Sequence, residues 1–294
     1  ARQAQAGFAA LGQAQVDAVV EAVAKAAASQ AEALAALAVE ETGFGKVQDK
    51  KTKNILASEK LLAAIRDMKT IGVLCDDKAR KLVEIAIPMG VIAGIVPSTN
   101  PTSTTIYKSM IALKAGNAIV FTPHPSARKC IGKTVEIIRG ALAQCGVCED
   151  LVSVMSVPTI EGSQELMRVA DLILATGGPG MVKAAYSSGT PALGVGAGNV
   201  PAYIERSADI VDAVTKIFAS KTFDNGTVCA SEQAIVTESV IADKVRATLV
   251  AQGAYFLEGL RQMQDRPSIG EVRGTGLWLA IDFTSDRKTR APYP

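Results

Sequence analysis

The pattern of hydrophobic and polar positions changes its period near Pro88. Before that residue, apolar side chains recur at helical spacing over residues 16–42, where Gly43 supplies the stop, and over the lysine-rich segment 46–68. Residues 81–87 alternate as in a strand, which ends at Pro88. We therefore expect the first part of the chain to be mainly helical, with one short strand at its end.

From residue 91 onward, short apolar segments alternate with amphipathic ones. The pattern predicts strands over residues 91–96, 118–121, 151–155, 171–175 and 233–237, and helices over residues 102–113, 126–144, 161–169, 209–221 and 239–252. The run Gly177-Gly-Pro-Gly opens one more helix, which extends to Ser187. This alternation implies an α/β fold with a parallel, Rossmann-type sheet and helices on both faces, in which ligands collect at the carboxyl ends of the strands.

The composition excludes several classes of partner. Charged residues make up 20% of the chain, the net charge is +2, and acidic and basic residues are interspersed, so no strong field is directed at nucleic acid or a membrane surface. Aromatic residues are only 4%, too few for a platform on which bases stack. The uncharged segment 85–107 is interrupted by prolines and is polar in its second half, so it is not expected to span a bilayer.

The cysteines predict a reducing compartment. Their number, five, is odd and their spacing is not that of a small disulfide scaffold, and the first forty residues have the pattern of a helix rather than of a signal peptide, so we expect a cytoplasmic protein. Cys75, Cys130, Cys145 and Cys148 are interpreted as small buried hydrophobes. Cys145 and Cys148 form a CxxC, but no second pair or nearby histidine accompanies them, so no metal site is expected.

Cys229 differs from the other cysteines. It lies in the run Phe223-Asp-Asn-Gly-Thr-Val-Cys-Ala-Ser, on a tight bend after Asn-Gly and among small polar neighbours. A turn displays a thiol, and backbone donors there could activate it as a nucleophile. The one histidine, His124, lies between two prolines and is expected to be a loop residue near a cofactor rather than a catalytic base.

Two strand ends carry further candidates. Asn100 follows the strand predicted over residues 91–96, and it either caps the next helix or donates its amide to an oxyanion beside the thiol. The loop Thr176-Gly-Gly-Pro-Gly either admits a phosphate near a helix N-terminus or is simply a tight turn, and it lacks both the GxGxxG spacing and the Walker pair. A third glycine cluster, over residues 191–201, allows close approach of a ligand or of another segment.

Taken together, these runs resemble the aldehyde dehydrogenase superfamily. The resemblance is carried by Pro88-Met-Gly-Val-Ile-Ala-Gly-Ile-Val-Pro-Ser-Thr-Asn-Pro, Thr176-Gly-Gly-Pro-Gly, Gly196-Ala-Gly-Asn-Val-Pro and Phe223-Asp-Asn-Gly-Thr-Val-Cys. The runs Glu41-Thr-Gly-Phe-Gly, Pro101-Thr-Ser-Thr-Thr-Ile-Tyr-Lys and Ala184-Ala-Tyr-Ser-Ser-Gly-Thr-Pro-Ala resemble more narrowly its CoA-acylating branch, which includes acetaldehyde and sulfoacetaldehyde dehydrogenases. The resemblance covers about residues 1–257.

The resemblance implies a role for each matching position. Cys229 would be the nucleophile and Asn100 the amide that binds the oxyanion. The positions implied to bind the dinucleotide are Thr99, Thr122, His124, Gly177 and Gly178. Val195 falls where hydrolytic members keep a glutamate that activates water, and its apolar side chain suits an enzyme whose acyl acceptor is the thiol of CoA.

The implied reaction oxidises a small aldehyde to its acyl-CoA. The Cys229 thiolate adds to the aldehyde, the oxygen is held by Asn100 and the backbone N–H of Cys229, and loss of hydride to the nicotinamide leaves a thioester that CoA takes over. NAD is the expected cofactor, and NADP stays open, although Thr122 offers no obvious partner for a 2′-phosphate. Acetaldehyde and sulfoacetaldehyde both stay open as substrates, and the family implies a homo-oligomer.

Three segments are expected along the chain. Residues 1–204 would form N-terminal helices and a dinucleotide-binding domain, and residues 205–257 the start of a truncated catalytic domain. Residues 258–294 resemble the C-terminal small domain of a class III, pyridoxal-phosphate-dependent aminotransferase, which suggests a gene fusion, a deletion or a mis-assembled reading frame with its seam near Glu258. The alternative to an acylating enzyme is therefore a non-catalytic nucleotide-binding remnant of one.

Overall fold

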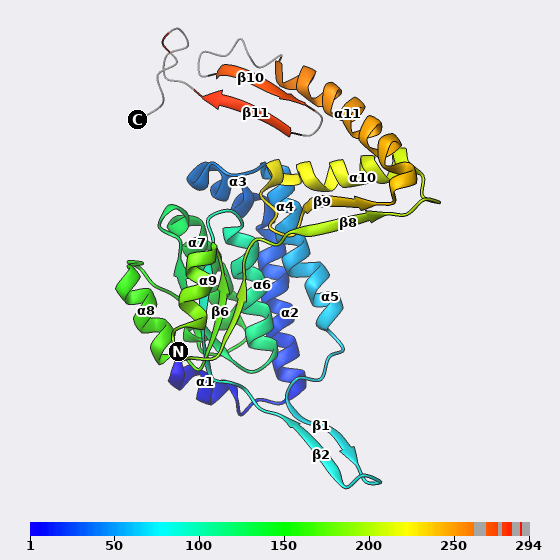
Figure 1. Ribbon diagram of the computed structural model, residues 1–294. Helices are drawn as coiled ribbons and strands as arrows, with labels where there is room; N and C mark the ends of the chain where they lie inside the picture. Colours follow the sequence, from blue (N-terminus) through cyan, green and yellow to red (C-terminus); the bar gives the residue numbers. More distant parts are fainter. Residues whose placement is uncertain (262–268, 276–277, 284–288, 290–294) are drawn as a thin grey trace. The chain divides into compact units, whose positions relative to one another are not determined.

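A five-stranded parallel sheet with the strand order β5-β4-β3-β6-β7 lies within residues 1–197 (Figure 1, where its strand β6 is labelled). Its strands are β3 (Val91–Val96), β4 (Ala118–Pro123), β5 (Val152–Val154), β6 (Leu172–Thr176) and β7 (Ala192–Val195). The computed structural model describes residues 1–261, 269–275, 278–283 and 289. The α/β architecture expected from the alternating pattern is confirmed, with the middle strand β3 buried along its whole length.

Alternate residues of β3 face two different hydrophobic cores. Ile92 and Val96 belong to one core and Ala93 and Ile95 to the other, as the two-residue period of a strand requires. A Cβ at Gly94 would lie 2.6 Å from the Phe121 ring of β4, so only glycine leaves room for that ring. A strand covered on both faces has no polar side, which is why its sequence is a continuous apolar run.

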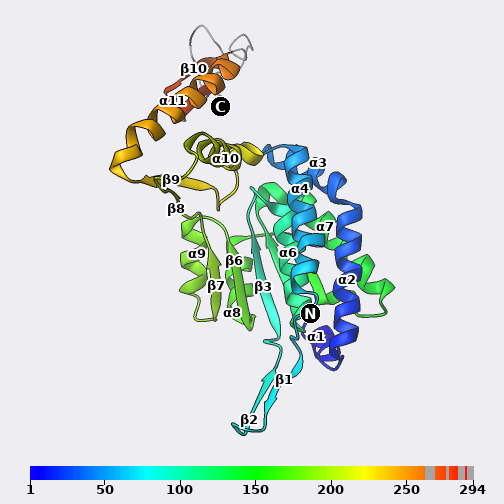
Figure 2. The same ribbon diagram turned by 90° about the vertical axis from the view of Figure 1, so that its right-hand side faces the viewer.

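Helices cover both faces of the sheet (Figure 2). On one face α2 (Gln13–Ser29), α6 (Pro101–Lys114) and α7 (Arg128–Gln144) share the larger core with β3, β4 and β5. On the other face α8 (Ile160–Val169) and α9 (Pro179–Tyr186) share the smaller core with β3 and β6. Short 3₁₀ turns precede α7 and β5, at Pro125–Ala127 and Glu149–Leu151.

The N-terminal helices are more broken than the sequence pattern predicts. The segment expected as one helix contains α2 and α3 (Ala31–Thr42), separated at Gln30, and it ends where Gly43 adopts a left-handed conformation with φ of 70°. The next segment is α4 (Val47–Ile55), a π-helical turn (Leu56–Lys60) and α5 (Leu61–Ile65). The short α1 (Arg2–Phe8) precedes them.

The buried Lys108 of α6 forms hydrogen bonds to two neighbouring strands near their carboxyl ends. Its ammonium donates to the carbonyl of Ile95 on β3 and to that of Leu174 on β6, each at 2.7 Å. Burial lowers the pKa of Lys108 to about 7. The lysine therefore supplies hydrogen bonds at the carboxyl edge of the sheet, where neither strand could obtain them from solvent.

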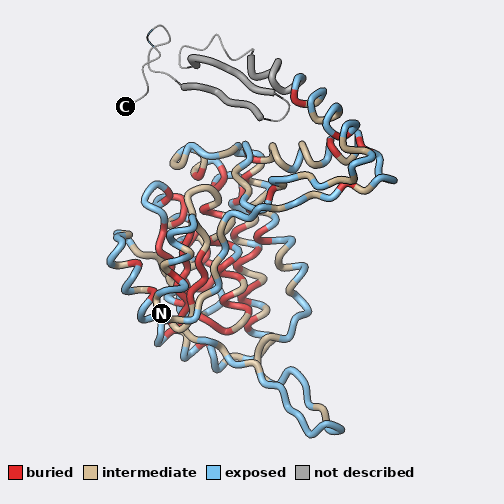
Figure 3. Tube along the Cα trace, viewed as in Figure 1, coloured by how far each residue is buried: buried red, intermediate tan, exposed pale blue. Residues whose placement is uncertain are grey.

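An antiparallel hairpin follows the N-terminal helices and precedes β3. It consists of β1 (Gly72–Asp77), which the sequence pattern did not predict, and β2 (Leu82–Ala86), which it did. Figure 3 shows the hairpin as mostly exposed, in contrast to the buried sheet. Large apolar side chains on it, among them Val73, Leu82 and Ile85, are exposed.

The chain divides into two compact units. Ala1–Ala197 and Phe223–Cys229 form the first, and Gly198–Thr222 and Ala230–Pro294 form the second. The expected boundary at residue 204 differs from this division, because the turn that carries Cys229 is held to the first unit by buried contacts of Asp224.

The second unit has a small core of its own. Strands β8 (Val200–Ile204) and β9 (Glu232–Thr237) pair in parallel. Helix α10 (Ile210–Thr222) follows β8 along the chain, and α11 (Ser239–Arg261) follows β9. The core contains Ile204, Ile210, Val214 and Val245. The segment 258–294 lies only in part within the described residues, which are the end of α11, an antiparallel hairpin of β10 (Ile269–Thr275) and β11 (Trp278–Phe283), and residue 289.

No single helix in the described part of the chain is long and apolar enough to cross a membrane. One pair of helices, α2 with α3, has the length and composition of a broken span, with a bend of 62° between the two helices.

Candidate active site

The register of the sheet brings the predicted site positions to one edge. Ile95 pairs with both Thr122 and Ala175, and Thr176 pairs with Val195. The loops that follow β3, β4, β6 and β7 therefore all leave from the same, carboxyl edge. These loops carry Thr99, Asn100, His124, Gly177 and Gly178. Ligands of open parallel sheets bind at this edge, so the topology gathers the candidates as expected.

Thr122 and His124 differ in their accessibility. Thr122 is buried, and its hydroxyl lies 2.7 Å from that of Ser163 on α8. His124 is exposed, and its Nδ1 lies 2.8 Å from the Ser126 hydroxyl at the start of the 3₁₀ turn. His124 is thus a loop residue, as the sequence indicates, while the Thr122 side chain is engaged with α8 rather than with solvent.

The glycine loop between β6 and α9 presents bare backbone. The N–H of Gly177 donates to the carbonyl of Val195 at 3.2 Å, so this loop continues the pairing of β6 with β7. A Cβ at Gly178 would meet no atom within 4 Å, and neither Gly177 nor Gly178 has a positive φ. The fold itself therefore does not require glycine at either position, and their missing side chains leave space for a ligand at the sheet edge.

The turn before Cys229 is built from left-handed residues. Asp224, Asn225 and Gly226 have φ angles of 51°, 55° and 72°, a conformation that is costly for all but glycine and is tolerated best by Asn and Asp. Three such residues in succession persist only where surrounding contacts hold them. In this turn those contacts converge on the buried carboxylate of Asp224.

Asp224 joins the turn to α4. Its carboxylate accepts hydrogen bonds from the Lys46 N–H at 2.8 Å, from the Lys50 ammonium at 3.1 Å and from the Thr227 hydroxyl at 2.7 Å, and it forms an ion pair with Lys53. Burial by itself would raise the pKa of Asp224, but the hydrogen bonds from Lys53, Thr227 and Lys46 and the charge of Lys50 outweigh burial and hold that pKa below its ordinary value. The carboxylate therefore stays ionised at neutral pH.

The close approach of Asp224 also explains Gly45. Gly45 has a φ of 77°, and a Cβ there would overlap the Asp224 carboxylate. Gly43 has a similar φ of 70°, but a Cβ there would meet nothing within 4 Å. Alanine substitution at Gly43 would therefore measure the free-energy cost of a left-handed alanine alone. The same substitution at Gly45 would add the free-energy cost of displacing Asp224.

Replacing Gly45 with alanine is expected to cost more stability than the same change at Gly43. Gly43→Ala should lower the free energy of unfolding by about 1–2 kcal/mol through backbone strain. Gly45→Ala should lower it by roughly a further 2 kcal/mol or more, because the buried ion pairs of Asp224 must shift. Urea unfolding of both variants measures the difference, and equal losses would contradict the close packing of Asp224 against Gly45.

Asn100 contacts the same turn. Its side-chain Nδ2 donates to the carbonyl of Thr227 at 3.1 Å, and its Oδ1 accepts from the Lys53 ammonium at 2.7 Å. The side chain makes no capping hydrogen bond to α6, although Asn100 occupies the N-cap position. Of the two roles that the sequence left open for the amide, the structure therefore excludes side-chain capping and brings the amide to the turn that ends at Cys229.

Cys229 is exposed at the end of this turn. The interpretation of the remaining cysteines as buried hydrophobes holds for Cys130 and is wrong for Cys75, Cys145 and Cys148, which are exposed. Cys75 lies on the projecting hairpin, Cys145 directly follows α7, and Cys148 directly precedes the 3₁₀ turn at Glu149–Leu151.

The sequence reasoning missed the residues that hold the two catalytic candidates together. Lys50 donates to the carbonyl of Thr99 at 2.8 Å as well as to Asp224, and Lys53 contacts both Asp224 and Asn100. Their only signal was the lysine-rich pattern of the helix over residues 46–68, which is typical of a solvated face. Their burial depends on a turn more than 170 residues away, which the local pattern does not contain.

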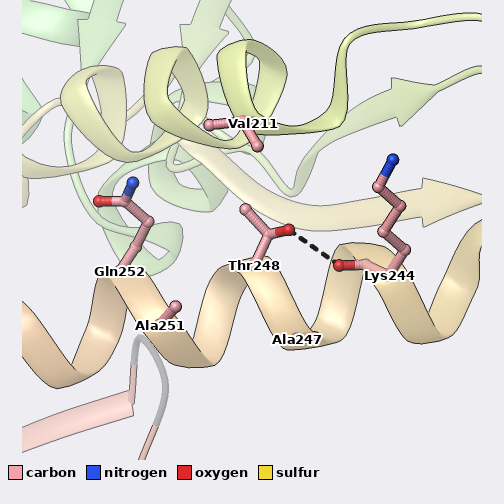
Figure 4. A pocket seen from close by; sticks show the side chains of 6 residues that line it. All are labelled: Val211, Lys244, Ala247, Thr248, Ala251 and Gln252. Atoms are coloured by element: carbon pink, nitrogen blue, oxygen red, sulfur yellow. Dashed lines mark hydrogen bonds between the residues drawn. The ribbon is translucent and has the colours of Figure 1, made fainter.

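A groove in the second unit does not include any of these residues. It lies between α10 and α11 and is lined by Val211, Lys244, Ala247, Thr248, Ala251 and Gln252 (Figure 4). Thr248 donates its hydroxyl to the carbonyl of Lys244, one turn earlier in the same helix. Lys244 is the only titratable side chain among its lining residues, so the groove offers little chemistry of its own. Within the described ranges, no group of three or more His, Cys, Asp or Glu residues could hold a metal ion.

The arrangement holds an oriented amide against the turn that ends at Cys229. An amide whose carbonyl oxygen is bonded by an ammonium carries its N–H donors on the opposite side, and at Asn100 that side faces the thiol turn. Pre-oriented donors beside a nucleophile are the usual means of holding the oxygen of a tetrahedral adduct. The bare glycine loop lies at the same sheet edge and can admit a ligand there.

Comparison with known proteins gives one family. The family model described as "Aldehyde dehydrogenase family" matches residues 1–263. The chain is 49% identical over 268 residues to the bifunctional aldehyde-alcohol dehydrogenase AdhE of Escherichia coli K12, which corresponds to 90% of this chain and 30% of AdhE.

Solved structures of two dehydrogenases are among those similar to the chain. The acetylating aldehyde dehydrogenase of Geobacillus thermoglucosidasius matches with a TM-score of 0.81 and 52% identity, over 86% of this chain and 56% of that one. The propionaldehyde dehydrogenase of Rhodopseudomonas palustris, with bound CoA and an acylated cysteine, matches with a TM-score of 0.72 and 31% identity, over 90% and 62% of the two chains. The chain thus spans less than two thirds of the length of each of these relatives.

Proposed function

The chain belongs to the aldehyde dehydrogenase family, and we propose that it converts a small aldehyde to the corresponding acyl-CoA with a nicotinamide dinucleotide as oxidant. The observation that carries this proposal is the contact of the Asn100 amide with Thr227, two residues before the exposed Cys229. An exposed thiol and an oriented amide are the two groups that covalent oxidation of an aldehyde needs from the protein.

In the proposed mechanism Cys229 forms and later releases a covalent acyl group. Its thiolate sulfur bonds to the aldehyde carbon, and the carbonyl electron pair moves to the oxygen, where Asn100 and the backbone N–H of Cys229 hold the negative charge. Collapse of this oxyanion expels the hydrogen as hydride and leaves a thioester on Cys229. The nicotinamide, when bound, supplies the acceptor for that hydride. The CoA thiolate then bonds to the acyl carbon, and the Cys229 thiolate leaves.

Acyl transfer to CoA rather than to water is supported by Val195. Val195 ends β7 at the carboxyl edge of the sheet and is exposed. The resemblance aligns it with the glutamate by which hydrolytic members activate water, and its isopropyl side chain has no group that could accept a proton. A thiol needs less activation than water to attack a thioester, so the absence of this carboxylate is compatible with CoA as acceptor. The relative with bound CoA and an acylated cysteine supports the same acceptor.

We propose that the dinucleotide binds at the carboxyl edge of the sheet. The proposed binding residues are Thr99, Thr122, His124, Gly177 and Gly178. The bare backbone at Gly178 supports this assignment, because a ligand can approach it without displacing a side chain. NAD is the proposed cofactor, and Thr122 provides no charged partner for the 2′-phosphate of NADP. Acetaldehyde and sulfoacetaldehyde both remain candidate substrates.

The oligomeric state, the location and the origin of each segment of the chain are further proposals. A homo-oligomer is supported by the exposed apolar side chains on the β1–β2 hairpin, and a cytoplasmic location by the odd number of cysteines. The proposed segments are residues 1–204 and 205–257 of dehydrogenase origin and residues 258–294 of aminotransferase-like origin. The family match ends at residue 263, close to the proposed seam.

We expect the chain to reduce NAD in the presence of CoA and a small aldehyde. The measurement is the growth of absorbance from reduced nicotinamide with purified chain, NAD and an aldehyde panel, with and without CoA. Sustained growth that requires CoA supports acylation, because without an acceptor the thioester on Cys229 stops turnover. Equal rates without CoA would contradict acylation. Dinucleotide binding with no growth for any aldehyde would favour the non-catalytic remnant.

A further inference from the structure

Lys53 contacts the proposed oxyanion-binding amide from the side opposite the thiol turn. Its ammonium donates to Oδ1 of Asn100 at 2.7 Å, while Nδ2 of Asn100 donates to the Thr227 carbonyl at 3.1 Å. The Lys53 side chain is only 11% exposed, so the contact is largely shielded from water. Asn100 is therefore held at both ends of its amide.

These two partners allow only one orientation of the amide. An ammonium can only donate, so it must contact the oxygen, and a backbone carbonyl can only accept, so it must contact the nitrogen. Rotation of the Asn100 amide by half a turn would put donor against donor and acceptor against acceptor. Lys53 and Thr227 together therefore fix which end of the amide is directed at the turn that carries Cys229.

Lys53 is itself rigidly placed on α4. The neighbouring Asn54 is fully buried, donates to the Ala31 carbonyl at 2.9 Å and accepts from the Thr102 hydroxyl in the first turn of α6 at 2.8 Å. Lys50, one turn before, donates to the Thr99 carbonyl at 2.8 Å. These bonds join α4 to α3, to the start of α6 and to the residue before Asn100, so they hold the backbone of α4 at Lys53 close to Asn100.

Neutralising Asp224 does not by itself account for the position of Lys53. Lys50 pairs with the same carboxylate oxygen, and its side chain is 3% exposed. Burial lowers the pKa of Lys53 although Asp224 acts in the opposite direction, and the charge of Lys50 lowers it further, so a second ammonium here is costly. The Lys53 ammonium also donates to Asn100, whereas the Lys50 ammonium donates to the Thr99 carbonyl. The contact with Asn100 is therefore specific to Lys53.

We propose that Lys53 is a positioning residue that orients and polarises the Asn100 amide toward the oxygen of the adduct on Cys229, an inference that rests on the proposed function. One N–H of the amide bonds to Thr227, and the other has only a weak contact, 3.4 Å, with the Thr99 hydroxyl, so it is available to the oxyanion. An ammonium on the amide oxygen draws electron density from the nitrogen, which strengthens the N–H as a donor.

The first test measures the NMR signals of the Asn100 side-chain amide and does not require catalytic turnover. The sequence contains five asparagines, at positions 54, 100, 117, 199 and 225, so selective ¹⁵N labelling gives a simple spectrum of side-chain amides. The Asn100 pair is assigned by its loss in Asn100→Ala. Lys53→Met is expected to shift the Asn100 resonances and to speed their hydrogen exchange by roughly tenfold or more, because one fixed partner is lost.

Two matched controls accompany this test. Lys51→Met removes a lysine of the same helix that pairs with Glu32 at the surface, and it should leave the Asn100 signals unchanged. Asn117, whose Oδ1 accepts from the Gly90 N–H at 2.9 Å, should keep its signals in every variant. Unmoved Asn100 signals in Lys53→Met would overturn the proposal.

The second test is kinetic and uses a double-mutant cycle. Lys53→Met is expected to lower kcat about tenfold and to leave the KM for aldehyde little changed. This loss is smaller than the roughly 10²–10³-fold loss of kcat that removal of a whole oxyanion donor typically causes. In the Asn100→Ala background the same change should cost less than about twofold, because Lys53 acts through Asn100. Equal losses in both backgrounds would show a merely structural role and overturn the inference.

A third variant covers the case in which Lys53→Met does not fold. Lys53→Gln keeps a donor to Oδ1 without the charge, so the Asn100 signals should shift but keep their slow hydrogen exchange, while kcat falls. Loss of those signals in a folded Lys53→Gln chain would also count against the inference. If the unsubstituted chain forms no reduced nicotinamide, the proposed function fails, while the amide spectrum still decides whether Lys53 orients Asn100.

Discussion

Replacing Cys229 with alanine is expected to abolish reduction of the nicotinamide cofactor. Without the thiol no covalent adduct forms, and a free aldehyde, which is a poor hydride donor, cannot be oxidised through the thioester route. The measurement is the steady-state rate of absorbance growth with NAD, CoA and an aldehyde that the unsubstituted chain accepts. Dinucleotide binding should be unchanged, since the proposed binding loops follow β3, β4 and β6 and do not include Cys229.

A matched control separates this loss from a general effect of removing a thiol. Cys148 is also exposed but lies in the turn after α7, so Cys148→Ala should keep the full rate. Survival of even a tenth of the rate in Cys229→Ala would refute the assignment of Cys229 as the nucleophile.

Replacing Asp224 with alanine is expected to cause the largest loss of stability. The change leaves the buried ammonium of Lys50 and the largely buried ammonium of Lys53 without their shared carboxylate, and breaking a buried pair typically costs about 3–5 kcal/mol. It also removes the contacts that hold three left-handed residues in succession, so the turn before Cys229 should lose its conformation. Urea unfolding measures the first effect, and proteolysis within the turn measures the second.

The pH dependence of stability provides a separate check on Asp224. Because its pKa is held below the ordinary value of 3.8, the folded chain binds fewer protons than the unfolded chain as the pH approaches that range. The stabilisation is therefore fully present above this pH and is lost as the pH falls through the folded pKa. The difference in unfolding free energy between the unsubstituted chain and Asp224→Ala should begin to narrow as the pH falls below about 5, and it should go on narrowing as the pH falls through the folded pKa.

Glu32 supplies the comparison for Asp224. Its carboxylate pairs with Lys51 at the surface, where an ion pair typically contributes about 0–1 kcal/mol, so Glu32→Gln should change stability little. A loss in Asp224→Ala no larger than that in Glu32→Gln would contradict the central role of the buried cluster.

The sheet was predictable because its signal is local. The segment predicted as a strand over residues 91–96 is β3 with the same bounds, since a strand buried on both faces must be apolar throughout. Strand β1 was not predicted, because on a projecting hairpin no core selects an apolar side chain at every second position. The break at Gln30 was not predicted either, since its neighbours on both sides have helical composition.

The candidate site was predictable only in part. The turn chemistry around Cys229 and the strand end before Asn100 are visible in the sequence, because Asn-Gly and Asn-Pro mark bends wherever they occur. The contact of Asn100 with Thr227 joins residues 127 positions apart, and the ion pair of Lys50 with Asp224 joins residues 174 apart. No local pattern records such pairs, so the lysines of α4 had the pattern of a solvated helix face.

The sequence by itself determined the alternation of strands and helices, the thiol on its turn and the loops at the strand ends. These features depend on periodicity and on the conformational preferences of individual residues, which act over a few positions. Only the tertiary structure decided that α4 lies against the thiol turn, that Asp224 is buried there, and that Lys53 rather than α6 is the partner of the Asn100 side chain. Charged groups leave water only when packing brings a partner to them, and that partner is fixed by the fold as a whole.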